Sequence, residues 1–391
     1  MRPYRVCARR LLRLGAALLC AALTACTVTP PASLPPIFND ADFAPAAAID
    51  AGRIFALDDA MRHYVQTEVG RERRNKNPRV ALYAALYDKS QLKLEYDAAK
   101  TRNASETFAA RSGNCLSLVI MTAALAHEMG LNVRYQEVLG EESWSRSGDM
   151  YFVAGHVNLV LGQRLGDNPN NYDAHSTMVI DFLPSGDVAG YRTRELSEAT
   201  IVAMYMNNRA AETMSEGLLQ QAYWWARSAI VQDPSFSGAY NTLGVIQFRH
   251  GDLAQARRTL AHALGRAPDN TVLLSNLAQA LEASGMADEA LPLRRRLLAL
   301  QPQPPFHYFN LGKAAMQQGD YGQAVRLFSR EIARDPYYHE FHFWLAQAYA
   351  HLGQLAQAGK QLELAMNNST TRSDHGLYAA KLQRLRAATT H

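Results

Sequence analysis

The spacing of apolar residues predicts a helical start to the first folded region of the chain. Residues 50–94 read mainly as helix, with an alanine-rich apolar stretch at 81–87. A stronger helical run covers residues 116–129 and is stopped by Gly130, because glycine readily ends a helix. The most apolar part of this run, residues 116–126, is far shorter than the roughly 20 residues that a membrane span needs. We therefore expect a buried helix of a folded domain here.

Two later segments alternate apolar and polar residues, which is typical of strands with one buried face. Residues 151–161 place His156 on the face opposite to Val157, Leu159 and Leu161. Residues 177–183 place Asp181 on the face opposite to Met178, Ile180 and Phe182. If these strands are antiparallel neighbours, His156 and Asp181 lie side by side on one face of a sheet.

The second half of the chain repeats with a period of 34 residues. Prolines, alanines and glycines each hold this period in a fixed phase, at Pro234, Pro268, Pro302 and Pro336; at Ala222, Ala256, Ala290, Ala324 and Ala358; and at Gly217, Gly251, Gly285, Gly319 and Gly353. Glycine ends one helix in a left-handed conformation, alanine lets two helices approach closely, and proline ends the second helix. The pattern resembles the tetratricopeptide repeat, a helical hairpin of about 34 residues.

This resemblance implies an all-α superhelix over residues 201–391, with five hairpins between about residues 203 and 370 and a capping helix at 376–388. The concave surface of such an array usually holds a protein or peptide partner. Several aromatic and amide residues fall in the first helices of the hairpins, where aromatic residues belong to the core more often than to a binding surface: Phe248, Phe306, Phe309, Phe343, Asn276 and Asn310.

The first 25 residues have the pattern of a secretory signal. Arginines come first, a short apolar run follows at 14–25, and small residues precede Cys26. The segment Leu23-Thr24-Ala25-Cys26 resembles the lipobox of bacterial lipoproteins, which implies cleavage after residue 25, acylation of Cys26 and a Pro-rich spacer over residues 26–48. Thr27 at the next position implies the outer membrane. The alternative is an ordinary secretory signal with a chance cysteine.

Processing of this kind changes the charge of the chain. The full sequence has 40 Lys and Arg against 36 Asp and Glu, a formal net charge of +4. The predicted signal contains five arginines and no acidic residue, so the remaining chain has a net charge of −1. We therefore see no electrostatic basis for nucleic-acid binding.

Processing also leaves Cys115 as the only free thiol among the four cysteines. Gly113 and Asn114 precede it and the helical run begins directly after it, so Cys115 is expected at a helix N-terminus. Unpaired N–H groups and the helix dipole favour a thiolate at such a position. A small hydrophobic core residue is the alternative interpretation.

Cys115, His156 and Asp181 then have the residue types of a thiol triad. The histidine accepts the thiol proton as a general base, and the carboxylate orients the histidine and stabilises its cation. His175 competes as a base, but it falls in a loop. A zinc site at Cys115, His156, His175 and Asp181 is also conceivable, although the spacing matches no known metal signature. No metal and no organic cofactor is implied.

Four stretches resemble the transglutaminase-like, papain-related superfamily: Gly113-Asn114-Cys115-Leu116-Ser117, Gly130-Leu131 followed by residues 133–138, Gly155-His156-Val157, and Ile180-Asp181-Phe182. The resemblance implies an α+β domain over residues 49–200, in which a cysteine nucleophile at a helix start packs against an antiparallel sheet. Members cleave amide bonds, exchange amines at glutamine side chains, or have lost activity. The sequence offers no clear side-chain oxyanion donor before Cys115, and an ionised Glu106 is a poor one.

We expect an envelope lipoprotein whose cysteine-dependent domain hydrolyses amide or peptide bonds, in preference to crosslinking, while the repeats hold a protein partner or substrate. The alternative is a non-catalytic tetratricopeptide scaffold or assembly factor with a degenerate transglutaminase-like domain.

Overall fold

A computed structural model describes residues 36–389 of the chain apart from 75, 88–91, 93, 99, 148–149, 165–176, 183–191 and 370. The chain divides into two units, residues 1–39 and residues 40–391. The predicted signal peptide, Cys26, most of the Pro-rich spacer and His175 lie outside the described residues. Within the described part, every helix is too short or too polar to cross a membrane.

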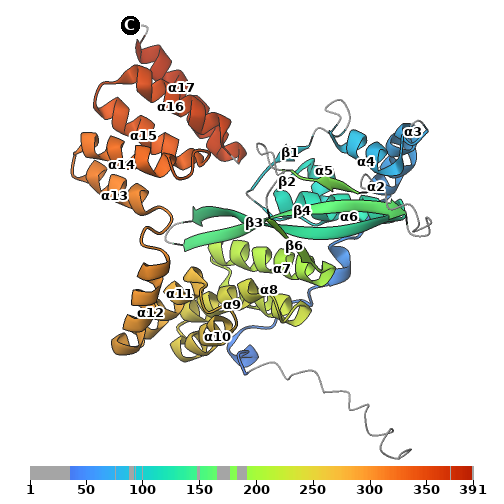
Figure 1. Ribbon diagram of the computed structural model, residues 1–391, viewed down its shortest axis with the longest axis horizontal. Helices are drawn as coiled ribbons and strands as arrows, with labels where there is room; N and C mark the ends of the chain where they lie inside the picture. Colours follow the sequence, from blue (N-terminus) through green and yellow to red (C-terminus); the bar gives the residue numbers. More distant parts are fainter. Residues whose placement is uncertain are drawn as a thin grey trace, which may run out of the picture. The chain divides into compact units, whose positions relative to one another are not determined.

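The second unit begins with the short helices that the pattern of residues 50–94 predicts (Figure 1). They are η1 Asp40–Asp42, η2 Ala51–Arg53, α2 Asp59–Tyr64, the π-helical turn η3 Val65–Val69, α3 Gly70–Glu72, α4 Pro78–Tyr87 and, further on, α5 Ala104–Ala110. Side-chain caps define where two of them start. Asp58 accepts from the N–H of Met61 at α2, and Asn103 and Glu106 form a reciprocal capping box at α5.

Helix α6, Cys115–Glu128, is the buried helix that the apolar run predicts. Every side chain from Leu116 to Ala126 is buried, because this helix packs against strands β3 and β4 and against helix α5. Such burial on all sides is characteristic of a central core helix. Its first residue, Cys115, therefore has a position fixed by the core.

A four-stranded antiparallel sheet in the order β5-β4-β3-β6 lies against α6. Its strands are β3 Leu131–Ser147, β4 Met150–Arg164, β5 Met178–Ile180 and β6 Arg192–Leu196. The two predicted strands are neighbours, with Leu159 opposite Ile180. Strand β5 is shorter than the predicted segment, so Asp181 follows the strand and does not lie inside it. A separate two-residue parallel pairing joins β1 Glu95–Tyr96 to β2 Ser112–Gly113.

The rest of the chain is the predicted array of helical hairpins. Its helices are α7 Glu198–Ser215, α8 Leu219–Gln232, α9 Ser237–His250, α10 Leu253–Arg266, α11 Thr271–Ala283, α12 Ala287–Leu300, α13 His307–Gln317, α14 Tyr321–Ile332, α15 His339–His351, α16 Leu355–Asn367 and α17 Arg372–Thr389. The five periodic glycines have φ between 72° and 95°, a conformation that glycine adopts without steric cost. The five periodic alanines are at most 1% exposed, as close helix packing requires.

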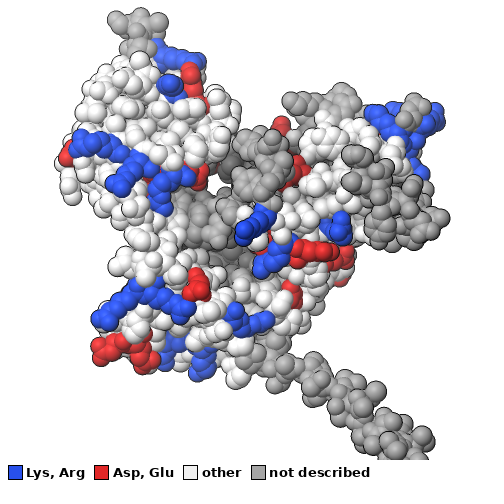
Figure 2. All heavy atoms as spheres, viewed as in Figure 1, with Lys and Arg blue, Asp and Glu red and all other residues white. Residues whose placement is uncertain are grey.

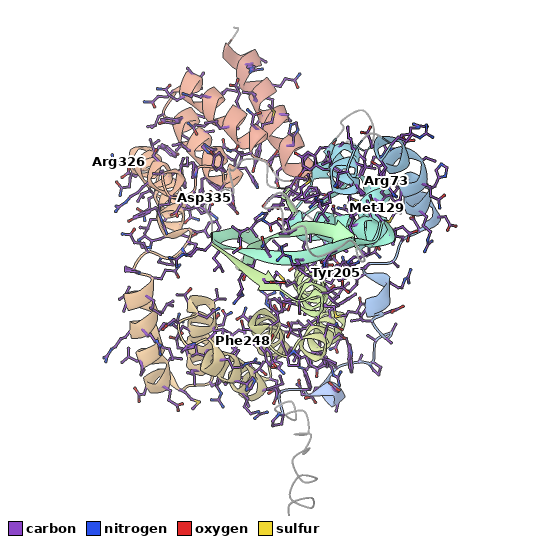
Figure 3. All side chains as sticks on the ribbon, turned by 45° about the vertical axis from the view of Figure 1, so that its right-hand side comes forward. Arg73, Met129, Tyr205, Phe248, Arg326 and Asp335 are labelled. Carbon is purple, nitrogen blue, oxygen red and sulfur yellow. The ribbon has the colours of Figure 1, made fainter. Side chains whose placement is uncertain are left out.

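The repeat core also decides the role of the aromatic residues. Phe306 and Phe309 are buried and pack with Phe328 and Phe341, so they belong to the core. Phe248 on α9 is half-buried (Figure 3). The capping helix α17 begins earlier than predicted and buries Leu382 against Leu362 and Ala346.

Candidate functional site

Cys115 is the first residue of α6, held there by a side-chain cap. Oδ1 of Asn114 accepts from the backbone N–H and from the hydroxyl of Ser117, at 2.9 and 2.8 Å. A Cβ at Gly113 would lie 2.7 Å from the Ser117 Cβ, so only glycine fits in this approach to the helix. The half-buried Cys115 thus occupies the helix N-terminus that the sequence predicts.

His156 and Asp181, which the alternating pattern places on one face, are in contact. Nε2 of His156 lies 2.8 Å from both carboxylate oxygens of Asp181. The histidine is 5% exposed on β4, and Asp181 directly follows the neighbouring strand β5. The sheet pairs Leu159 of β4 with Ile180 of β5. His156 lies three residues before Leu159 and Asp181 one residue after Ile180, so their side chains approach each other across the two strands.

The imidazole of His156 also reaches the thiol. Burial alone lowers the pKa of His156, but hydrogen bonds with Asp181 and with the Cys115 side chain, together with the charges of both groups, raise it from 6.5 to about 9. Since Asp181 holds Nε2, Nδ1 is the ring nitrogen left for the thiol. His156 is thus hydrogen-bonded to Asp181 and interacts electrostatically with the Cys115 side chain.

Asn158 is a site residue that the sequence reasoning missed. Its Nδ2 donates to Oδ2 of Asp181 at 3.0 Å, while its own Oδ1 is buried without a hydrogen-bond partner. The signal was present, because Asn158 stands two residues after His156 and therefore on the same face of the strand. A buried amide that donates to a carboxylate holds the carboxylate in its ionised form and in one orientation.

Tyr87 of α4 holds the other side of Asp181. Its hydroxyl donates to the backbone oxygen of Asp181, and its ring stacks on Phe182 with a centroid separation of 5.9 Å. Burial raises the pKa of Tyr87, so the phenol keeps its proton and remains a donor. No local sequence pattern predicts this contact of Tyr87 with Asp181, because the two residues are 94 positions apart.

Tyr96 is a further unpredicted neighbour of the thiol. The parallel pairing of β1 with β2 sets Tyr96 opposite Gly113, and the N–H of Asp97 donates to the Gly113 oxygen at 3.0 Å. Burial, followed by the charge of Cys115, raises the pKa of Tyr96.

The first repeat helix is bonded to the start of α6 through Thr101. Glu212 of α7 accepts from the Thr101 N–H at 2.7 Å, and Asn208 of α7 donates to the Thr101 hydroxyl at 3.3 Å. That hydroxyl also accepts from Nδ2 of Asn114 at 2.8 Å. Tyr205, on the same helix α7, is buried and stacks edge to face on Trp225 of α8 (Figure 3). The helix that opens the repeats is thus part of the support of Cys115.

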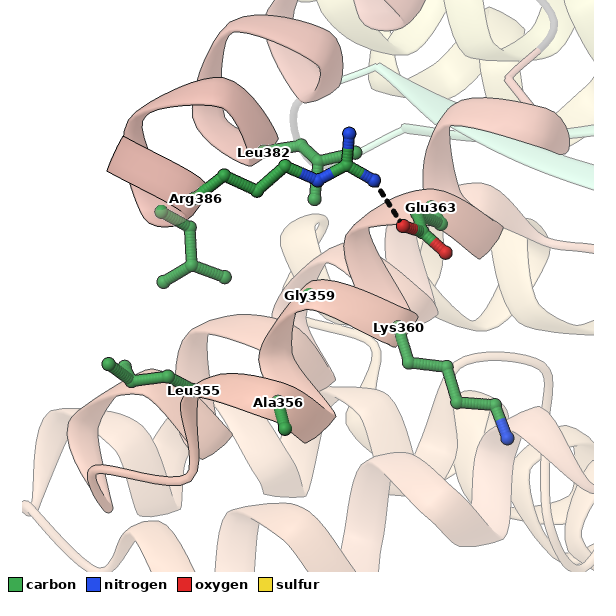
Figure 4. A pocket seen from close by; sticks show the side chains of 8 residues that line it. Leu355, Ala356, Gly359, Lys360, Glu363, Leu382 and Arg386 are labelled. Carbon is green, nitrogen blue, oxygen red and sulfur yellow. Dashed lines mark hydrogen bonds and ion pairs between the residues drawn. The ribbon is translucent and has the colours of Figure 1, made fainter. Parts of the chain in front are cut away.

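Other surface features lie away from these residues. A pocket of about 400 Å³ is lined by α16 and α17, where Arg386 bonds to Glu363 (Figure 4). On the face shown in Figure 2, basic side chains lie over α12 and α14 with acidic side chains close by. Among the described residues, no group of three or more His, Cys, Asp or Glu side chains could hold a metal ion.

Comparisons with known proteins identify the repeats. Tetratricopeptide-repeat family models match residues 227–311 and 309–367. A search of curated proteins finds no match to this chain. Residues 227–367 are therefore tetratricopeptide repeats, a class that generally binds protein or peptide partners.

Several solved structures are similar to part of the chain. YrrB, described as a tetratricopeptide-repeat protein with an unusual peptide-binding site, is 22% identical with a TM-score of 0.25, over 46% of this chain and 92% of its own. MamA is 18% identical with a TM-score of 0.25, over 44% and 93%. A thermophilic tetratricopeptide-repeat protein in Thermus thermophilus is 17% identical with a TM-score of 0.30, over 46% and 99%. Because these TM-scores are low, the assignment of the repeats rests on the family models.

Proposed function

We propose that this protein is a thiol-dependent amide hydrolase whose repeats hold a protein partner or substrate. Cys115 is the nucleophile, His156 the general base and acid, and Asp181 the orienting carboxylate, as in a transglutaminase-like domain. The observation that carries the proposal is the hydrogen-bonded pair of His156 and Asp181, both largely buried, whose imidazole also interacts with the Cys115 side chain.

The proposed reaction begins when Sγ of Cys115 adds to an amide carbon, forming a carbon–sulfur bond and an oxyanion. The carbon–nitrogen bond then breaks, and the leaving amine takes the proton that His156 holds. Water next adds to the thioester and gives a proton to His156, and the thiolate leaves. Asp181 stays ionised throughout and stabilises the imidazolium.

Peptide cleavage tests this proposal directly. Wild-type protein and a Cys115→Ala variant are incubated with a complex peptide mixture, and new peptide ends are identified by mass spectrometry. Cleavage that depends on Cys115 is expected. Products that carry new amine adducts at glutamine would instead indicate acyl transfer to amines. The absence of both reactions, with a folded wild-type protein, would contradict the proposal.

A second candidate function is a non-catalytic scaffold. It is favoured by the family matches, both of which fall on the repeats, and by the bonds that make α7 a support of the first domain. In this case the repeats would bind a protein partner while Cys115 reacts no faster than an ordinary thiol. The same peptide experiment distinguishes the two functions.

We also propose that the protein is anchored to the outer membrane through an acylated Cys26, facing the periplasm. The support is the sequence of residues 1–27 alone. Membrane fractionation and mass spectrometry of the N-terminal peptide test it. A Cys26→Ser variant should leave the membrane fraction, and an unmodified Cys26 in the mature protein would contradict the anchor.

A further inference from the structure

The side-chain amide of Asn114, the residue before the nucleophile, is held at both ends. Its Oδ1 accepts from the N–H and the hydroxyl of Ser117, which caps the first turn of α6. Its Nδ2 donates to the hydroxyl oxygen of Thr101 at 2.8 Å. An amide whose acceptor and donor ends both have partners is fixed in one orientation. The helix start that holds Cys115 therefore depends on the oxygen of Thr101.

Thr101 is in turn held by one turn of the first repeat helix, α7. Its N–H donates to Glu212 at 2.7 Å, and its carbonyl oxygen accepts from Arg209 at 3.5 Å. Its hydroxyl oxygen accepts from Nδ2 of Asn208 at 3.3 Å. This oxygen thus uses one lone pair for Asn208 of the repeats and the other for Asn114 of the first domain. Because Thr101 is only 1% exposed, water does not replace these partners.

Asn208 occupies a repeat position that here serves the first domain. It stands 68 residues, or two periods of the repeat, before Asn276 of α11. Asn276 donates to Asn241 of α9 at 2.8 Å, so it bonds within the array. Asn208 instead donates to Thr101, outside the array. The same register position joins two repeats in α11 and joins the repeats to the thiol domain in α7.

The cap of α6 matters for the chemistry of Cys115 because this thiol stands at the helix N-terminus. The N–H groups of a well-formed first turn and the helix dipole stabilise a thiolate, and this stabilisation falls when the turn frays. Without the Thr101 oxygen, the amides of Asn114 and Asn208 both lose an acceptor, and the cap is no longer held in one orientation.

We propose that Thr101 is a positioning residue of the Cys115 site, through which helix α7 of the repeats sets the reactivity of the thiol. This inference rests on the proposed function of Cys115. Thr101 acts through Asn114 rather than on the reacting atoms. The repeats are then part of the thiol site as well as a partner-binding array, and a displacement of α7 changes the reaction rate at Cys115.

The rate of iodoacetamide alkylation, measured as a function of pH, tests this role. The full chain with Cys7→Ser, Cys20→Ser and Cys26→Ser keeps Cys115 as its only thiol. In Thr101→Val, the rate at pH 6 is expected to fall about threefold to tenfold and the midpoint of the pH profile to rise, because less of the thiol is ionised. Thr101→Ser keeps the hydroxyl oxygen and should restore the wild-type profile. Asn208→Ala removes only a bond from α7 and should raise the midpoint by a smaller amount.

Thr122→Val is the matched control, because it makes the same change at a buried threonine of α6 whose hydroxyl has no hydrogen-bond partner. It should leave the profile unchanged. Equal profiles for Thr101→Val and wild type would overturn the inference, as would an equal shift in Thr122→Val. An Asn208→Ala profile identical to that of wild type would overturn the role of α7, and this variant decides the inference if Thr101→Val does not fold. A wild-type thiol that resists alkylation until unfolded would instead refute the proposed function itself.

Discussion

Nε2 of His156 lies 2.8 Å from each carboxylate oxygen of Asp181. The imidazole of a residue in β4 is therefore held by the residue that directly follows the neighbouring strand β5. This relationship leaves Nδ1 for the thiol of Cys115. The carboxylate favours the imidazolium, and the imidazolium in turn favours the thiolate.

Replacing Asp181 by Asn should weaken this coupling with little change in shape. Loss of the charged partner lowers the proton affinity of His156, and we expect iodoacetamide alkylation of Cys115 at pH 6 to slow about tenfold or more. Asp269→Asn, at an exposed ion pair of the repeats, is the matched control. Identical alkylation rates for Asp181→Asn and wild type would contradict the proposed orienting role.

The raised pKa of His156 predicts how stability depends on pH. The folded value of about 9 lies above the unfolded value of 6.5, so the imidazolium stabilises the fold fully below pH 6.5 and this contribution is lost as the pH rises through 9. The contribution is at most about 3 kcal/mol. Urea unfolding of wild type and His156→Ala at pH 6 and pH 9.5 measures it. The difference between the two proteins should shrink at the higher pH, and a constant difference would disagree with the account.

Asn158 should act through the position of Asp181. A hydrogen bond to a charged group is worth about 1.5–3 kcal/mol, so Asn158→Ala should release the carboxylate and slow alkylation of Cys115 at pH 6. Asn158→Asp should slow it more, because two carboxylates then face each other. If Asn158→Asp reacted as fast as wild type, the amide would have no role in holding Asp181.

Glu212 should link the stability of the repeats to the first domain. Glu212→Ala removes the acceptor of the Thr101 N–H and the partner of Arg209, and we expect a loss of about 1.5–3 kcal/mol in the free energy of unfolding. Glu216→Ala, at the exposed end of the same helix, is the control and should change little. Equal urea midpoints for Glu212→Ala and wild type would show that the link contributes nothing.

Gly312 and Gly265, both in repeat helices, should respond in opposite ways to replacement by alanine, because only Gly312 is closely packed. A Cβ at Gly312 would lie 2.6 Å from the Phe328 ring, so Gly312→Ala should destabilise the fold by about 1–3 kcal/mol. At Gly265 on α10 nothing lies within 4 Å of the added Cβ, so Gly265→Ala should stabilise by up to about 1 kcal/mol. Thermal unfolding of the pair measures this contrast, and shifts of the same sign would refute it.

The repeat architecture was predictable because the same structurally constrained residues recur at a fixed period of 34 residues. Glycine at a left-handed helix end and alanine at a close helix contact follow from local rules, and both predictions are confirmed. The same holds for the helix that starts at Cys115 and for the pairing of the two alternating strands. The transglutaminase-like identity of this domain stays a prediction.

Other parts of the site could not be predicted, for identifiable reasons. The β1–β2 ladder has only two pairs, which is too short to produce an alternating pattern, so Tyr96 gave no signal. The contact of Tyr87 with Asp181 depends on tertiary packing across 94 residues. The position of Asn158 could have been predicted, because every second residue of a strand lies on the same face and Asn158 is two residues after His156.

The most direct test of the thiol–imidazole pair is the rate of iodoacetamide alkylation of Cys115 at pH 6 in folded protein that has no other thiol. The account predicts fast alkylation in the wild type and a rate at least about tenfold lower in His156→Ala, because an ordinary thiol with a pKa of about 8.5 is almost fully protonated at this pH. A thiol that reacts only after urea unfolding, equally in both proteins, would contradict the account and leave a repeat scaffold with an inert cysteine.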